Sequence, residues 1–94
     1  MSIEKANEFI EKFFSDDAFM EKTIREGGLY KRGNDAPNDN ATMVEAAKAV
    51  GFDFTKEEFE QANKTYKEKV GEWKAIKNVF HMIKIVKKVR KTAN

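Results

Sequence analysis

Few side chains in this 94-residue sequence could do chemistry. His81 is the single histidine, and its nearest carboxylates in sequence, Glu72 and Glu68, are more than two helical turns away. A histidine that acts as an acid, a base or a metal ligand needs a partner within reach. We therefore expect a structural role for His81.

Acidic and hydroxyl side chains make no stronger case for catalysis. Asp16 and Asp17 are adjacent carboxylates, but in the first turn of a helix they stabilise the positive end of the helix dipole. Ser2 and Ser15 precede helical patterns, and neither lies near a base or in the glycine elbow of a serine nucleophile. We expect no enzymatic activity and assign no catalytic residue.

Sites for metals, phosphates and cofactors are not indicated. The segment with Asp35, Asn38 and Asp39 lacks the alternating ligands, central glycine and closing glutamate of a calcium loop. Gly27-Gly28 lacks the following lysine or third glycine of a phosphate-binding loop. The absence of cysteine excludes disulfides, thiolate metal sites and cysteine nucleophiles. No metal, cofactor or small-molecule substrate is expected.

Helices must position whatever functional residues exist, because no alternating strand pattern occurs. Apolar residues recur at three-to-four spacing from Ile3 to Ile24, and again after Thr42 and Thr55, two threonines that each precede a glutamate by three residues as in a capping box. These patterns predict an all-α fold, a small bundle of four to five helices whose last helix is long or broken near Gly71. We expect the stripes of the first and fourth helices to form the core.

Charge divides the chain into two parts. The formal net charge is +2, yet residues 1–63 hold eight basic and 14 acidic side chains, whereas residues 64–94 hold ten basic and two acidic ones. We divide the chain into a helical domain over 1–70, with a loop over 29–41, and a basic amphipathic helix over 71–94. The basic segment is expected to dock at least partly against the acidic one. The sequence lacks a signal-peptide pattern and an apolar run of membrane-spanning length, so a cytoplasmic location is expected.

The basic segment has apolar and cationic residues at helical spacing. The apolar face is predicted to comprise Trp73, Ile76, Val79, Phe80, Ile83, Val86 and Val89. The candidate contacts with an anionic surface are Lys74, Lys77, Lys84, Lys87, Lys88, Arg90 and Lys91. This helix could fold back onto the core, lie on an anionic membrane surface, or bind nucleic acid or an acidic protein partner. Candidate contacts with a protein partner are the apolar residues expected to remain exposed: Leu29, Tyr30, Trp73 and Phe80.

Two stretches resemble the sequence pattern of a known family. The first is Met1-Ser2-Ile3-Glu4-Lys5-Ala6 with Phe9-Ile10, Phe13 and Ser15-Asp16-Asp17, and the second is Ala46-Ala47 followed by Gly51-Phe52-Asp53-Phe54-Thr55-Lys56-Glu57-Glu58-Phe59. Together they resemble the Nif-eleven leader-peptide domain over residues 1–60, with Phe59 where leucine is usual.

The resemblance implies a small helical bacterial domain with a role in recognition. Many such domains are held by a peptide-modifying enzyme while a C-terminal core peptide is altered, and a transporter-linked peptidase then cuts after a double glycine. Here the only double glycine, Gly27-Gly28, lies inside the domain. We expect a non-enzymatic recognition domain, either a leader or a stand-alone member, whose protein partner is a peptide-modifying enzyme or a transporter. The alternative is a protein that binds a membrane surface or nucleic acid through its basic C-terminal helix.

Overall fold

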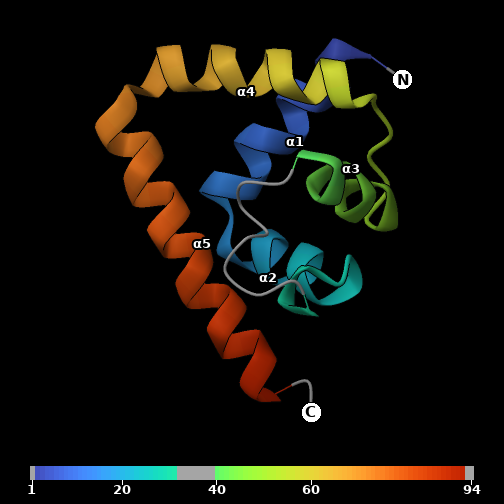
Figure 1. Cartoon of the computed structure of the whole chain (residues 1–94), viewed down its shortest axis with the longest axis vertical. Helices are drawn as coiled ribbons and strands as arrows, with labels where there is room; N and C mark the ends of the chain where they lie inside the picture. The colour runs from blue at the N-terminus through green and yellow to red at the C-terminus, as the bar shows by residue number, and fades with distance from the viewer. Residues whose placement is uncertain (1, 32–39, 93–94) are drawn as a thin grey trace.

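The computed structural model describes residues 2–31 and 40–92, which form five α-helices and one short 3₁₀ helix (Figure 1). The elements are α1 (Ile3–Ser15), α2 (Asp17–Glu26), η1 (Leu29–Lys31), α3 (Asn40–Ala49), α4 (Lys56–Val70) and α5 (Glu72–Thr92). No strand occurs in these two ranges. The predicted all-α bundle is confirmed.

Two long helices frame the rest of the molecule. α4 crosses one end of it, and α5 runs from the end of α4 along one side to the C-terminus (Figure 1). α1 packs against α4 and α2, while α5 packs against α2, η1 and α4. The basic C-terminal helix thus forms one side of the bundle.

Side-chain caps fix the starts of three helices. The Ser2 hydroxyl accepts a hydrogen bond from the backbone N–H of Lys5, and Thr55 forms the predicted capping box with Glu58. The carboxylate of Asp16 accepts from the N–H of Phe19. Asp16 is therefore the cap of α2 itself, and our placement of it inside the first turn was wrong.

The start of α3 also differs from the prediction. α3 begins at Asn40, two residues before the predicted cap, so Thr42 lies inside the helix with only 7% of its surface exposed. The predicted loop over 29–41 is helical at both ends, since Leu29–Lys31 form η1 and Asn40 and Ala41 belong to α3. Residues 32–39, with the rejected calcium ligands, lie outside the described residues.

Gly71 separates α4 from α5. Its φ of 89° and ψ of 155° lie in a region that is essentially restricted to glycine, and its N–H donates to the carbonyl of Lys67. The chain consequently turns here. Of the two predicted possibilities, a long last helix or one broken near Gly71, the structure shows the break.

Aromatic rings occupy the centre of the core. The ring centroid of Phe9 lies 5.4 Å from that of Phe13, 5.7 Å from that of Phe52 and 5.6 Å from that of Phe54. Every helix contributes to this core, including α2 through Met20. The expectation that α1 and α4 form the core was therefore incomplete.

The basic segment docks on the acidic part of the chain, as expected. Met82, Val86 and Val89 of α5 are at most 2% exposed and belong to the common core. At the edge of this contact, the Lys88 ammonium lies 3.2 Å from the Glu21 carboxylate. Lys69, on α4, forms an ion pair with Glu11 of α1.

Candidate functional site

α5 has two opposite apolar faces. Asn78, Met82, Val86 and Val89 are buried against the bundle, whereas Trp73, Ile76 and Phe80 are 69%, 46% and 63% exposed. The single apolar face predicted from Trp73 to Val89 is wrong. Trp73 and Met82 are nine residues apart, which at 100° per residue places them about 180° apart around the helix. The seven predicted residues themselves span about 200° of the helix at 100° per residue, from Val89 through Val86 to Trp73, so some of them face the bundle and others face solvent.

The exposed apolar residues form a row. Trp73, Ile76, Phe80 and the half-buried Ile83 follow one another at intervals of three, four and three residues. They cover about 15 Å of the helix at 1.5 Å per residue. We call these four residues the outward row. α5 lies at the edge of the molecule in Figure 1.

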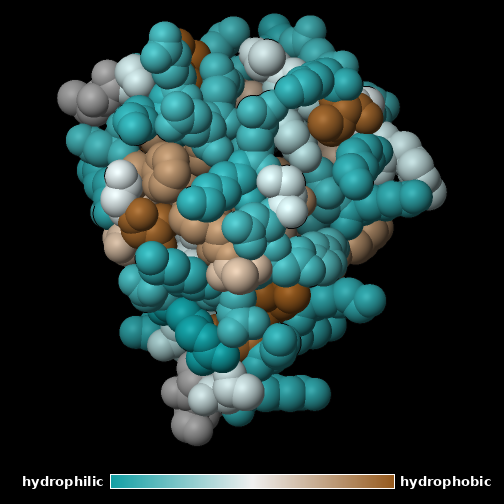
Figure 2. Space-filling view, turned by 180° about the vertical axis from the view of Figure 1, so that it is seen from behind, coloured by the Kyte–Doolittle hydropathy of each residue, from teal (hydrophilic) through white to brown (hydrophobic). Residues whose placement is uncertain are grey.

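The outward row is unusual for this molecule. Among the described residues, Ile3 is the only other large apolar side chain with comparable exposure, at 38%. The space-filling view from behind shows a largely hydrophilic surface on which apolar side chains form separate small patches (Figure 2). Single exposed apolar residues are ordinary, whereas aligned ones indicate a contact surface.

The four candidate partner contacts have different positions. Leu29 is fully buried, so its proposal as a contact residue was wrong; η1 turns this side chain into the core. Tyr30 is half-buried against the core, and its carbonyl accepts a hydrogen bond from Nε of Arg90 over 3.1 Å. Trp73 and Phe80 are exposed, as a contact surface requires. Ile76 is as well placed, although it was not among the predicted contact residues.

The seven candidate cations fall into two groups. Lys88 forms an ion pair with Glu21, and Arg90 donates a hydrogen bond to the carbonyl of Tyr30, so both side chains join α5 to the bundle. The others are exposed and form no ion pair within residues 2–31 and 40–92: Lys74, Lys77, Lys84, Lys87 and Lys91. The ammonium of Lys77 lies 5.6 Å from the ring centroid of Trp73, within cation–π range. The outward row is therefore flanked by available positive charge.

His81 has a partner that sequence spacing did not reveal. Its Nε2 lies 2.8 Å from Oδ1 of Asp17, which comes from α2. The expectation that His81 lacks an acid–base partner was therefore wrong, since packing brings together residues 64 positions apart. Both side chains are exposed, and the described residues contain no cluster of three or more potential metal ligands. The pair joins α5 to α2 at the surface.

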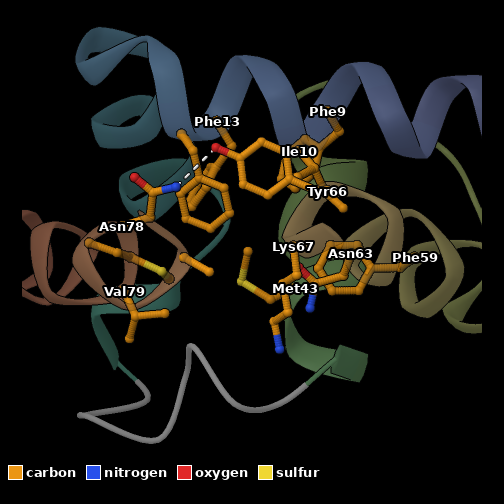
Figure 3. A pocket seen from close by; sticks show the side chains of 13 residues that line it. Phe9, Ile10, Phe13, Met43, Phe59, Asn63, Tyr66, Lys67, Asn78 and Val79 are labelled. Carbon is orange, nitrogen blue, oxygen red and sulfur yellow. Dashed lines mark hydrogen bonds between the residues drawn. The ribbon is translucent and has the colours of Figure 1, made fainter. Parts of the chain in front are cut away.

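A small pocket lies between α1, α4 and α5. Figure 3 shows Phe9, Phe13 and Tyr66 around it, with Met43 and Asn63 on another side. The space that a water-sized sphere can enter is about 80 Å³, which holds a few water molecules. Among the described residues that line it there is no carboxylate and no histidine. The titratable side chains in its lining are Tyr66 and Lys67.

Comparisons with known proteins give no assignment. No protein-family model matches the chain, and neither a curated protein nor a solved structure shows a significant match. None of the described helices has the length and apolar character needed to cross a membrane. Function must be argued from the outward row and its surroundings.

Proposed function

We propose that this protein is a small non-enzymatic recognition domain whose binding surface is the outward row of α5. The observation that carries the proposal is the joint exposure of Trp73 and Phe80 on a helix whose other face is already buried. Trp is enriched among the residues that dominate binding energy at protein interfaces. Full burial of a phenylalanine side chain such as that of Phe80 contributes about 1.5–3 kcal/mol.

The resemblance of residues 1–60 to leader-peptide domains suggests the kind of partner. We propose that the partner is a peptide-modifying enzyme or its associated transporter, and that it binds the folded chain. α5 supports a stand-alone member more than a precursor, because Met82, Val86 and Val89 are buried in the common core. Removal of residues 71–94 as a core peptide would expose the apolar surface that these side chains cover.

The test is binding of the full-length protein to the peptide-modifying enzyme or transporter encoded beside its gene, measured by calorimetry. We expect binding that the double variant Trp73→Ser/Phe80→Ser weakens at least tenfold. Ile3→Ser is the matched control, since Ile3 is also exposed but lies on α1. Equal affinities of the double variant and the wild type would contradict this surface, and a gene with no such neighbour would contradict the proposed partner.

A second candidate function is binding to an anionic membrane surface or nucleic acid. The unpaired exposed lysines beside the outward row, such as Lys77 and Lys84, favour it, because cationic and apolar side chains together suit an anionic interface. The test is titration with phosphatidylglycerol vesicles and with double-stranded DNA at low and high salt. Absence of binding to both at low salt would eliminate this function.

A further inference from the structure

We infer that the outward row binds an amphipathic helix of a protein partner, and that this partner helix has acidic residues along one flank. The inference rests on the proposed function and specifies the chemistry of the partner. It follows from two heptad spacings on α5 and from the charges beside them.

The first spacing is that of the apolar residues. Trp73 and Phe80 are seven residues apart, and so are Ile76 and Ile83. This is the a and d pattern by which one helix packs against another along a shared seam. A lysine, Lys87, occupies the next a position, so the apolar seam ends after about three turns.

The second spacing is that of the lysines. Lys77, Lys84 and Lys91 are also seven residues apart, and they occupy the e positions beside the seam. Residues at e and g positions select partners by charge in helix pairs. On the opposite flank, the g positions are Glu72, Val79, which lines the pocket between α1, α4 and α5, and Val86, which is buried in the core. A partner helix would therefore meet three cations on one side only.

A second copy of the chain fits this face poorly. α5 has one acidic residue, Glu72, ahead of the outward row and none from Trp73 to Thr92. An antiparallel pair of α5 helices would set the e-position lysines of one copy against those of the other. This juxtaposition of like charges disfavours self-association.

A flat membrane surface is also a less suitable partner for the outward row than a helix. Interfacial helices bury an apolar face and keep their lysines on the polar side. Here Lys84 and Lys91 project within about 20° of the direction of Trp73, at 100° per residue. A bilayer that accepted Trp73 would meet these ammonium groups along the same line, whereas a narrow helix can pass beside them.

The fluorescence of Trp73 provides a direct test, because it is the only tryptophan in the chain. The probe is a tryptophan-free synthetic helix with leucine at a and d positions and glutamate at e and g positions. A second peptide with lysine in place of glutamate is the charge control. We expect the acidic peptide to shift Trp73 emission to the blue with an affinity at least tenfold above that of the basic peptide. Added salt should reduce this difference.

Charge reversal of the protein completes the test. The variant Lys77→Glu/Lys84→Glu should invert the preference and bind the basic peptide at least tenfold more tightly than the acidic one. The matched control Lys22→Glu/Lys64→Glu makes the same change in net charge at exposed positions on α2 and α4, and it should keep the original preference.

Four results would overturn the inference. The first is equal affinity of the protein for the two peptides, and the second is a shift of Trp73 emission with phosphatidylglycerol vesicles but not with the acidic peptide. The third is an inverted peptide preference in the control variant Lys22→Glu/Lys64→Glu. The fourth is a shift of Trp73 emission that occurs without peptide, when the protein dimerises at higher concentration. If the acidic peptide fails while partner binding still depends on Trp73 and Phe80, the inference fails and the proposed function stands. If partner binding is also insensitive to both residues, both fail.

Discussion

Asn78 of α5 donates a hydrogen bond from its side-chain amide to the hydroxyl of Tyr66 on α4, over 2.9 Å (Figure 3). The bond joins the two helices across the turn at Gly71. Asn78 is only 7% exposed, so its amide has a protein partner at a position where few water molecules can reach it. Loss of a partner from a buried polar group costs about 1–3 kcal/mol.

This relationship gives a prediction for stability. Tyr66→Phe keeps the ring, which stacks on Phe14 at 5.5 Å, and removes only the hydroxyl. We expect it to lower the free energy of unfolding by about 1–2 kcal/mol, because the Asn78 amide is left without its acceptor. Urea titrations of Tyr66→Phe, Asn78→Leu and the double variant should give a coupling energy of about 0.5–1.5 kcal/mol. Strictly additive effects would show that the hydrogen bond does not contribute.

The two faces of α5 should respond differently to truncation. Met82→Ala removes a side chain that is 1% exposed, and it should lower the free energy of unfolding by about 2–5 kcal/mol. Phe80→Ala, on the outward row, should change it by less than about 0.5 kcal/mol, since the ring is 63% exposed. Both values come from urea unfolding followed by circular dichroism. Comparable losses at the two positions would contradict the assignment of the faces.

Periodicity and capping predicted most of the helices, because these features act within a few residues. The start of α1 at Ser2 and that of α4 at Thr55 follow from local hydrogen bonds that a sequence displays directly. The start of α3 does not, since a threonine followed by a glutamate three residues later can also occur inside a helix. There Thr42 is buried, which is a property of packing.

The candidate site was less accessible to sequence reasoning. Apolar residues occur on opposite sides of α5, and spacing alone cannot state which side meets the bundle. The buried Asn78 settles the orientation only once Tyr66 is known to face it. Leu29 was misplaced for a related reason, because the residues just after Gly27-Gly28 have no periodic pattern to show which of them turns inward. The pairing of His81 with Asp17 likewise depends on tertiary contact.

A side chain at position 71, in place of the hydrogen of Gly71, should destabilise the fold. A Cβ built at this position meets no atom within 4 Å, so the expected cost is conformational and arises from the positive φ of 89°. We predict that Gly71→Ala lowers the free energy of unfolding by about 1–3 kcal/mol. Lys74→Ala, an exposed position in the first turns of α5, is the control and should have little effect. An unchanged urea midpoint for Gly71→Ala would show that the turn has another low-energy form.

The contact between the acidic and basic parts of the chain should be sensitive to acid. The hydrogen bond and charge of Lys88 lower the pKa of the Glu21 carboxyl from its ordinary value of 4.5, with a smaller effect from Arg25. Since the folded-state pKa is depressed, the unfolded chain binds this proton more readily. The stabilisation is therefore present above about pH 4.5 and is lost as the pH falls through the lower folded-state pKa.

Glu21→Gln tests this dependence. At pH 7 the variant should be less stable than the wild type, and the gap should close as the pH is lowered below 4.5, because the wild-type carboxyl is then also neutral. Added salt at pH 7 should narrow the gap as well, since Lys88 is exposed to solvent and Glu21 is partly exposed. Glu60→Gln is the matched control, an exposed glutamate on α4 with no ion pair among the described residues. A gap at Glu21 that persists unchanged at low pH would show that the lost contact is not electrostatic.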